Sequence, residues 1–236
     1  MEIRSPVDWD EYAKERILTR SRLLTRHHRV VTDVILSWLA VEDTSQSFLE
    51  VGCGDGFWLD LLRNLGFRRI KGIDISEHYV EICRRKGHDV ELSPVEQYEP
   101  NTLYDWVYSI DVLEHLDDPR AMLDRMLQFL KPHGRVLFKV PVYDSLPRRV
   151  ERVIMRTSRL AQSQRTDPTH IQAFSVRTTR RMIEDAGCRI AKGTCTSCMW
   201  RFLDRLPGVL NAGIQAVCFG GRFGDAYMVI AEKAEE

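Results

Sequence analysis

The stretch Phe48-Leu49-Glu50-Val51-Gly52-Cys53-Gly54-Asp55-Gly56, followed further along by Gly72-Ile73-Asp74, decides the fold of this chain. The first piece is an apolar run that leads into a glycine-rich turn, and the second ends another run on a carboxylate. A buried strand, a tight turn, a helix and a second strand ending in an acid form the first half of a nucleoside-binding α/β domain. The sequence therefore predicts such a domain.

The spacing of the glycines separates the possible nucleoside ligands. A dinucleotide-binding turn follows the pattern Gly-x-Gly-x-x-Gly, but here the third glycine is Gly56, and Phe57 occupies its expected place. Glu50 and Asp55 flank the turn. A carboxylate beside a diphosphate costs free energy, whereas one beside an ammonium or sulfonium group gains it. The turn therefore favours a cationic ligand.

Acidic residues recur at the predicted carboxyl ends of neighbouring strands. Asp74 ends the run that begins at Arg69, and Asp111 follows the run 106–110. Open α/β sheets place their ligand crevice at these ends. S-adenosylmethionine carries an amino group, a ribose diol and a sulfonium, so it fits this pattern of negative charge.

At this point the chain resembles the class I S-adenosylmethionine-dependent methyltransferases, in particular the small-molecule branch that includes the ubiquinone-pathway O-methyltransferases. The matching pieces, which span residues 46–142 in the family's order, are Leu49-Glu50-Val51-Gly52-Cys53-Gly54-Asp55-Gly56, Gly72-Ile73-Asp74-Ile75-Ser76, Tyr104-Asp105-Trp106-Val107, Asp111-Val112-Leu113-Glu114-His115-Leu116 and Leu130-Lys131-Pro132-His133-Gly134-Arg135-Val136-Leu137. The chain departs from the family at Pro94, where many relatives have an aspartate that contacts adenine. Adenine recognition is therefore expected from the backbone of Val95 or from Glu96.

The resemblance implies a fold class and a division of the chain. The expected fold is α/β: a Rossmann-like, seven-stranded methyltransferase sheet, mostly parallel with an antiparallel last strand, and helices on both faces. Residues 1–236 are expected to form a single domain, because a chain of this length can bury one sizeable core. Within it we expect an N-terminal helical lid (1–45), a cofactor-binding core (46–142) and a substrate-side, sheet-completing region (143–236).

Resemblance and chemistry together give roles to the residues of the cofactor site. Asp74 is expected to accept hydrogen bonds from both ribose hydroxyls, and Glu50 to hold the methionine amino group, directly or through water. The predicted cofactor-binding residues are Glu50, Gly52, Cys53, Gly54, Asp55, Asp74, Ile75, Val95, Asp111 and Val112. The alternative is a plain strand-to-helix turn with solvated acids, and the number of concurring motifs argues against it.

The acceptor chemistry is expected outside the shared core. Methylation of a hydroxyl requires alignment and a base that removes the proton. His170 is the predicted base, because it lies in the connection after the fifth strand, which in relatives folds over the substrate; Asp167 could orient its ring. His115 is the second candidate, placed at the start of a helix. The alternative for His170 is a local hydrogen bond next to a turn.

The sequence predicts no metal site. Asp111-x-x-Glu114-His115 resembles the acidic-histidine cluster with which some quinone-pathway relatives hold a divalent metal, but the spacing identifies no further ligands. Cys195-Thr196-Ser197-Cys198 is a single Cys-x-x-Cys, which lacks half the ligands of a structural zinc site. We expect it to hold ordinary semi-buried thiols in the sixth strand.

Composition gives expectations about binding partners and cellular location. The formal net charge is +0, which gives no electrostatic case for nucleic acid. No apolar run reaches the roughly 18 residues of a membrane span, and no signal-like start is present, so a cytoplasmic location without a transmembrane segment is expected. The six cysteines are scattered, which suits a reducing compartment.

Hydrophobic periodicity predicts the elements. The expected strands are 47–51, 69–74, 88–92, 104–110, 134–141 and, last, 226–232, and the expected helices include the region 10–39, 121–130 and 176–186.

A basic segment, 148–165, could meet an anionic substrate or form a solvated helical face. The apolar segment 206–219 could cover a substrate, meet lipid, form a homodimer contact or pack on the sheet. Trp9 and Tyr12 could contribute to the lid or pack in the core, and the basic helix with His27 and His28 stays ambiguous.

These observations predict S-adenosylmethionine-dependent methyl transfer to a hydroxyl group of a small-molecule acceptor. Two alternatives remain open: a nucleic-acid methyltransferase, disfavoured because Asp111-Val112-Leu113-Glu114 lacks the signature of amino-methylating adenine enzymes, and a non-catalytic cofactor-binding protein.

Overall fold

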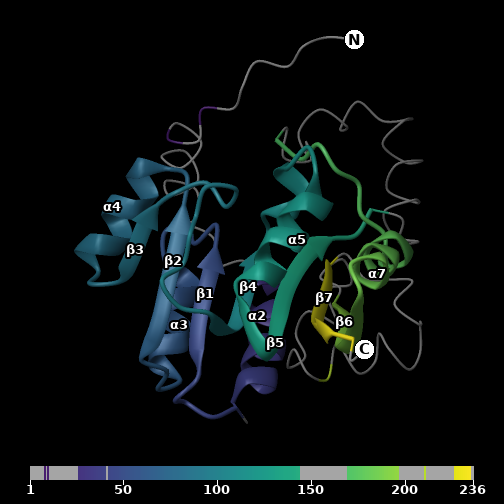
Figure 1. Ribbon diagram of the computed structural model, residues 1–236, viewed down its shortest axis with the longest axis horizontal. Helices are drawn as coiled ribbons and strands as arrows, with labels where there is room; N and C mark the ends of the chain where they lie inside the picture. The colour runs from purple at the N-terminus through teal and green to yellow at the C-terminus, as the bar shows by residue number, and fades with distance from the viewer. Residues whose placement is uncertain are drawn as a thin grey trace.

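A seven-stranded sheet forms the centre of the computed structural model (Figure 1). The structure describes residues 8, 10, 26–40, 42–143, 169–196, 210 and 226–234, with only the backbone of 26–30. The strand order is β3-β2-β1-β4-β5-β7-β6. The strands are β1 (Ser47–Val51), β2 (Arg69–Asp74), β3 (Asp89–Leu92), β4 (Tyr104–Ile110), β5 (Leu130–Pro141), β6 (Cys188–Thr196) and β7 (Ala226–Lys233).

Strand directions confirm the predicted sheet. β1 pairs in parallel with β2 and β4, β2 with β3, and β4 with β5. β7 runs antiparallel to both of its neighbours, β5 and β6. All five residues of β1 are buried, as expected for a central parallel strand whose two faces are both covered. The chain orders its strands outward from β1, which leaves the β1–β4 border as the point where the connections reverse direction.

Helices cover both faces of the sheet. They are α2 (Arg26–Leu39), α3 (Phe57–Asn64), α4 (Glu77–Arg85), α5 (Pro119–Gln128) and α7 (Val176–Asp185), with a short 3-10 helix, η1 (Leu113–His115). One core cluster packs α5 and α7 against alternate residues of β4 and β5, such as Val107 and Phe138. The opposite cluster packs α2 and α3 against the intervening residues, such as Trp106 and Leu137. This alternation follows from the period-two geometry of strands.

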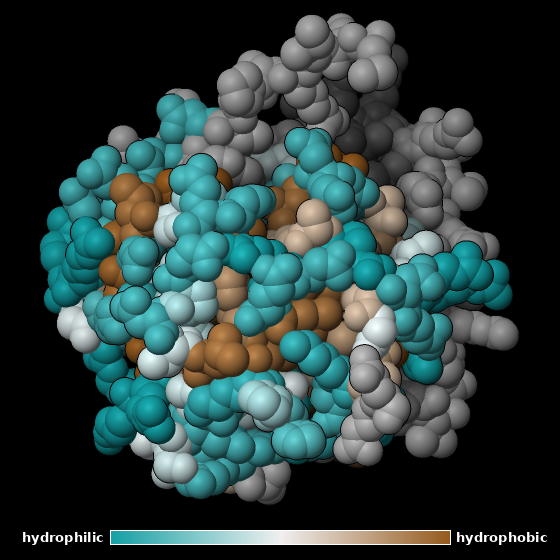
Figure 2. Space-filling view, viewed as in Figure 1, coloured by the Kyte–Doolittle hydropathy of each residue, from teal (hydrophilic) through white to brown (hydrophobic). Residues whose placement is uncertain are grey.

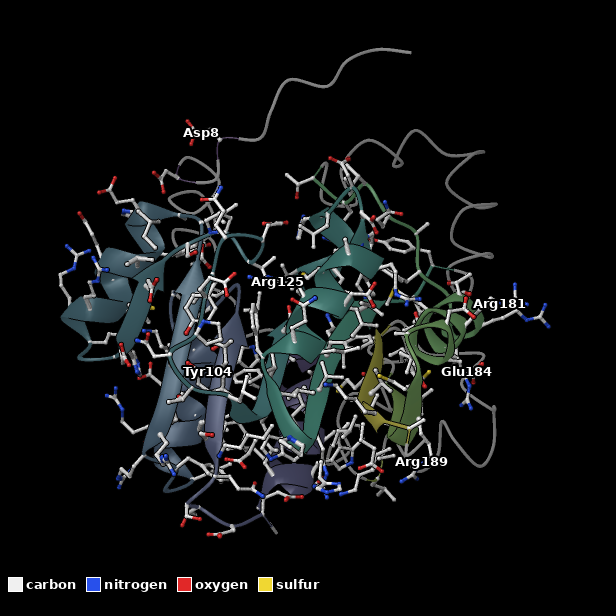
Figure 3. All side chains as sticks on the ribbon, viewed as in Figure 1. Asp8, Tyr104, Arg125, Arg181, Glu184 and Arg189 are labelled. Carbon is white, nitrogen blue, oxygen red and sulfur yellow. The ribbon has the colours of Figure 1, made fainter. Side chains whose placement is uncertain are left out.

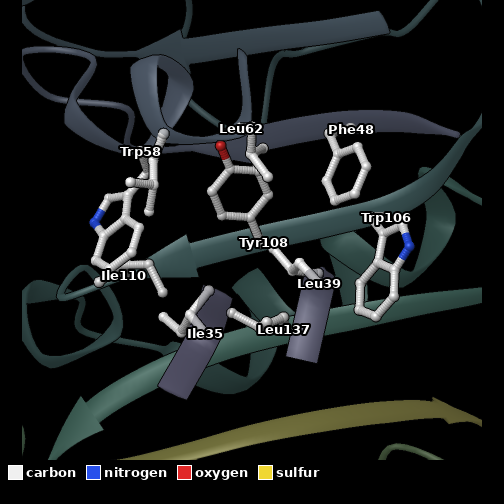
Figure 4. Close-up of a pocket in the computed structure, with 10 residues that line it drawn as sticks. Ile35, Leu39, Phe48, Trp58, Leu62, Trp106, Tyr108, Ile110 and Leu137 are labelled. Carbon is white, nitrogen blue, oxygen red and sulfur yellow. The ribbon is translucent and has the colours of Figure 1, made fainter. Parts of the chain in front are cut away.

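An apolar pocket lies within the second cluster, between α2, α3 and the sheet (Figure 4). No charged side chain lines it, so it belongs to the packing of these helices. The lining residues are Ile35, Leu39, Phe48, Trp58, Leu61, Leu62, Trp106, Tyr108, Ile110 and Leu137.

The space-filling view in Figure 2 shows one face of the molecule. On the face that carries α5, hydrophilic residues predominate and hydrophobic residues show between them (Figure 2). The edge of the sheet opposite β3 carries Arg181 and Glu184 of α7 and Arg189 of β6 (Figure 3). β6 is an edge strand, and exposed Arg189 and Lys192 make that edge a poor template for pairing with another chain. Among the described residues, no helix combines the length and the apolar character needed to cross a bilayer.

The predicted boundaries hold for most elements and fail at two points. The fifth strand begins at Leu130 rather than residue 134, because Lys131-Pro132-His133-Gly134 does not end the pairing: Tyr104 pairs with Leu130 and Trp106 with Arg135, so the intervening residues form an irregularity that His133 accommodates at φ 62°. His115 ends η1 and does not start a helix, since α5 begins only at Pro119.

Of the predicted helical region 10–39, the structure describes Asp10 and α2. The basic segment 148–165, Asp167, Cys198, Trp9, Tyr12 and the segment 206–219 apart from Leu210 lie outside the described residues, as do the side chains of His27 and His28.

Candidate active site

The glycine-rich turn joins β1 to α3 at the carboxyl end of the sheet. Gly52, Gly54 and Gly56 all have positive φ, a region that residues with a Cβ rarely adopt. A Cβ on Gly52 would lie 2.5 Å from Val112 Cγ2, so the turn passes directly against the residues that follow β4. The backbone N–H groups of Gly52 and Cys53 donate to the Ile73 carbonyl at 2.9 and 3.0 Å, which fixes the turn to the end of β2.

Asp74 lies in the middle of this arrangement. Its side chain is 8% exposed; Oδ2 accepts from the Gly54 N–H at 2.8 Å and Oδ1 from the Ser76 N–H at 2.9 Å. Each carboxylate oxygen keeps a further lone pair, so the group can accept two more hydrogen bonds, as a ribose diol requires. Burial raises the pKa of Asp74, and the backbone donors oppose that effect.

Glu50 is the second acid at the turn. It is buried, and Tyr108 donates its hydroxyl hydrogen to Glu50 Oε2 at 2.9 Å. Burial raises the pKa of Glu50 well above its usual range. The sequence analysis did not anticipate Tyr108, because only the β1–β4 register, in which Glu50 pairs with Tyr108, brings these residues together.

Other predicted cofactor residues lie around this pair. Asp55 Oδ1 accepts from the Phe57 N–H at 3.3 Å, at the start of α3. Ile75 is among the most exposed large apolar side chains, as is Leu92, at the end of the neighbouring strand β3. Val95 is buried in the core, and its carbonyl accepts a hydrogen bond from Arg125 Nε of α5 at 3.4 Å. Ile75 and Leu92 thus offer apolar surface beside Asp74.

Asp111 follows β4 with φ 58°, a strained value for a residue other than glycine. Its carboxylate forms an ion pair with Lys139, whose side chain is only 4% exposed. Lys139 was missed by the sequence analysis, although a lysine inside the apolar run 136–140 was an available signal. Burying the charge of a lysine without a partner costs free energy, so Asp111 and Lys139 stabilise each other as one ion pair.

Glu114, His115 and His170 gather next to that ion pair. One ligand-type atom from each lies within 4.8 Å of the others. Glu114 is fully buried, and neither of its carboxylate oxygens has a hydrogen-bond partner among the described residues. Burial, reinforced by the charge of Asp111, raises the pKa of Glu114 well above its usual range. A buried carboxyl group beside two imidazoles is uncommon, which makes this cluster a candidate catalytic site.

Contacts from neighbouring residues orient the two imidazoles. Tyr143 Oη lies 2.5 Å from His170 Nδ1, and Thr169 Oγ1 lies 2.8 Å from His115 Nδ1. His170 Nε2 is 3.9 Å from Glu114 Oε1, and the two rings meet edge to face at 4.7 Å. The structure therefore brings both predicted catalytic histidines together. Tyr143 and Thr169 were not anticipated, because their partners are distant in the sequence.

The segment that carries His170 is fixed to η1 by its backbone. The N–H groups of Ile171 and Gln172 donate to the Glu114 carbonyl at 2.9 and 3.1 Å. The cluster could take up a proton, and its carboxylate and two imidazoles are also ligand types that divalent metals accept.

Comparisons with known proteins identify the family of the chain. A family model described as a methyltransferase domain matches residues 23–192. The chain is 34% identical over 94 residues to the ubiquinone biosynthesis O-methyltransferase of Paramagnetospirillum magneticum, covering 37% of each protein. It is 28% identical over 106 residues to the malonyl-acyl-carrier-protein O-methyltransferase 2 of Ilyobacter polytropus, covering 42% of this chain and 41% of the relative. The chain thus matches less than half the length of these relatives.

Solved structures share the architecture. The magnesium protoporphyrin IX methyltransferase of Synechocystis PCC 6803, crystallised with bound SAH, superposes with a TM-score of 0.64 at 19% identity, over 88% of this chain and 84% of that one. The similarity establishes the fold.

Proposed function

We propose that this chain, which belongs to the methyltransferase domain family, transfers the methyl group of S-adenosylmethionine to a hydroxyl group of a small-molecule acceptor. The observation that carries this proposal is the cluster of Glu114, His115 and His170 near the cofactor turn. Methylation of a hydroxyl needs a proton acceptor at the reacting oxygen, and this cluster supplies one.

In the proposed cofactor site, Asp74 accepts hydrogen bonds from the ribose hydroxyls and Glu50 faces the methionine amino group. Their support is geometric: both carboxyl groups lie beside the glycine turn, and each Asp74 oxygen already accepts a backbone N–H that fixes its direction. Gly52, Cys53 and Gly54 would let the backbone approach the methionine part, and the bound cofactor supplies the electrophilic methyl group. Asp111 and Val112 would line the crevice nearby.

The proposed base is His170. As the base, it keeps its proton on Nδ1 and donates it to the Tyr143 oxygen, which leaves the Nε2 lone pair available. The acceptor O–H transfers its proton to Nε2 while the oxygen forms its bond to the methyl carbon and the carbon–sulfur bond breaks. Glu114, 3.9 Å from Nε2, would stabilise the imidazolium or take up its proton, and His115 would orient the acceptor.

Two relatives whose names specify O-methyltransferases support oxygen as the acceptor atom. The zero formal charge supports a small molecule rather than a nucleic acid. We also propose a reducing, cytoplasmic setting, which the scattered placement of the six cysteines in the sequence supports.

The test compares His170→Ala with the wild type and with His133→Asn, which removes an exposed histidine at a position where asparagine tolerates the positive φ. A labelled methyl donor is first incubated with panels of phenols, catechols, carboxylic acids, sugars and amines. On the best hydroxyl acceptor, His170→Ala should lower turnover at least about a hundredfold, while His133→Asn should be unaffected. S-adenosylhomocysteine affinity, measured by calorimetry, should stay near the wild-type value in both.

Three other outcomes would contradict parts of the proposal. Labelling of amines only would exclude O-methylation. Unchanged turnover in His170→Ala would remove the base. Activity that a chelator abolishes and a divalent metal restores would make the cluster a metal site instead.

A further inference from the structure

Asp10, near the start of the sequence, contacts the loop after β2. Its Oδ1 accepts from the Ser76 hydroxyl at 2.5 Å and from the His78 backbone N–H at 3.1 Å. Ser76 is 1% exposed and Asp10 is half-buried, so the contact is partly shielded from solvent. The partners are 66 and 68 residues apart in sequence, so the contact is a tertiary one.

The same loop holds Asp74. The Ser76 N–H donates to Asp74 Oδ1 and the Gly54 N–H to Oδ2, while the Ser76 hydroxyl also accepts from the Tyr79 N–H at 3.3 Å at the start of α4. A continuous set of hydrogen bonds therefore runs from Asp10 through Ser76 to Asp74 and on to the glycine turn. Whatever fixes the position of Ser76 also fixes one of the two donors that orient the Asp74 carboxylate.

Charge gives Asp10 a second effect. A carboxylate at the amino end of a helix such as α4 is favourable, because the first N–H groups of the helix point toward it. The charges of Asp10 and Asp74 repel each other, so the unliganded loop holds like charges close together. The hydrogen bonds from Ser76 and His78 hold the Asp10 carboxylate near Asp74 despite this repulsion. Hydroxyl groups that donate to Asp74 would stabilise its negative charge and so offset the repulsion.

We propose that Asp10 is a positioning residue for cofactor binding, which fixes the Asp74–Ser76 loop in the form that accepts the ribose hydroxyls. This inference rests on the proposed role of Asp74. It adds the N-terminal segment to the cofactor site through one named side chain.

The test measures S-adenosylhomocysteine affinity by calorimetry in the full chain, with thermal unfolding of the ligand-free protein beside it. Asp10→Ala should weaken binding about five- to tenfold, because a loop that must be ordered on binding lowers the apparent affinity. Asp10→Asn keeps an oxygen acceptor and should stay within about twofold of the wild type. Asp118→Ala removes the side chain that caps α5 through the Ala121 N–H at 3.0 Å, so it serves as a matched loss of a helix cap away from this loop.

A structural role alone would give a different pattern. If Asp10→Ala lowers stability but binds like the wild type, or if Asp118→Ala weakens binding equally, the proposal is wrong. Ser76→Ala and the double variant extend the test: if both residues act through one network, the double variant should bind little worse than Asp10→Ala alone. Additive losses would overturn the network.

Asp74→Ala separates the two proposals. If that variant binds normally, the ribose role of Asp74 fails, and Asp10 loses its proposed function with it. If Asp74→Ala loses affinity but Asp10→Ala does not, only the positioning role fails.

Discussion

The Glu50 carboxyl group is buried at the end of β1, where it accepts a hydrogen bond from Tyr108. Its folded-state pKa lies well above the unfolded value because burial disfavours the charged form. Between those two pKa values the folded chain holds a proton that the unfolded chain releases. The free energy of unfolding therefore falls as pH rises through this window.

Glu50→Gln should flatten that part of the pH dependence, because the amide does not titrate. Urea unfolding at several values between about pH 5 and pH 8 measures it, and the variant should gain stability relative to the wild type toward the upper end. Glu114→Gln should change the pH dependence of stability in the same direction, because burial raises the pKa of Glu114 as well. An unchanged slope in Glu50→Gln would show that Glu50 is ionised in the folded protein.

Residue roles could be predicted where the chain itself brings groups together. Glu50 lies one residue before the end of β1 and Asp74 ends β2, so their proximity to the glycine turn follows from the β–turn–α–β order. Tyr108 and Lys139 could not be assigned in the same way. Their partners are set by strand register across the sheet, and Tyr143 and Thr169 meet the histidines only through the fold.

At the scale of an element, two glycines of the turn allow the stability cost of backbone strain to be distinguished from the cost of a steric clash. Gly52 and Gly54 both have positive φ, but only the Cβ of an alanine at 52 would collide with Val112; nothing lies within 4 Å of one at 54. Gly54→Ala should cost about 1 kcal/mol of stability from backbone strain alone.

Gly52→Ala should cost more, about 2–4 kcal/mol, because the collision at 2.5 Å forces the turn or Val112 to move. Chemical denaturation of both variants tests the order of the two effects. Equal losses would mean that Val112 moves aside easily.

Element boundaries were predictable where capping and periodicity agree. α7 begins after Ser175, which forms a capping box with Thr178, and the predicted helix lies within a residue of the observed one. The start of β5 was missed because a non-local contact overrides the local turn signal. A Pro-His-Gly sequence is typical of a turn, but tertiary pairing with Tyr104 carries the strand through it.

For the whole molecule, cofactor binding should appear as global stabilisation. A ligand that binds only the folded state at about 100 times its Kd raises the free energy of unfolding by about 2.7 kcal/mol. S-adenosylhomocysteine should therefore raise the melting temperature of the wild type, and Asp74→Ala should reduce that shift strongly. Asp89→Ala, at the exposed start of β3, should keep the full shift. An equal shift in Asp74→Ala would exclude that carboxylate from the ribose site.

The architecture as a whole could be predicted because the motifs occur in the order of the β–α alternation, and the sheet confirms it. The acceptor pocket could not, because no motif in the connection after β5 specifies an acceptor and much of that connection lies outside the described residues.

The position of β7 has a consequence for how this protein is made. Arg135 of β5 pairs with Glu232 of β7, and β6 joins the sheet only through β7. During vectorial synthesis, β1 to β5 leave the ribosome well before their neighbour exists, and the open side of β5 stays unpaired until residue 233 emerges. Such late, long-range pairing slows folding and leaves an unpaired strand edge that favours aggregation until β7 is in place.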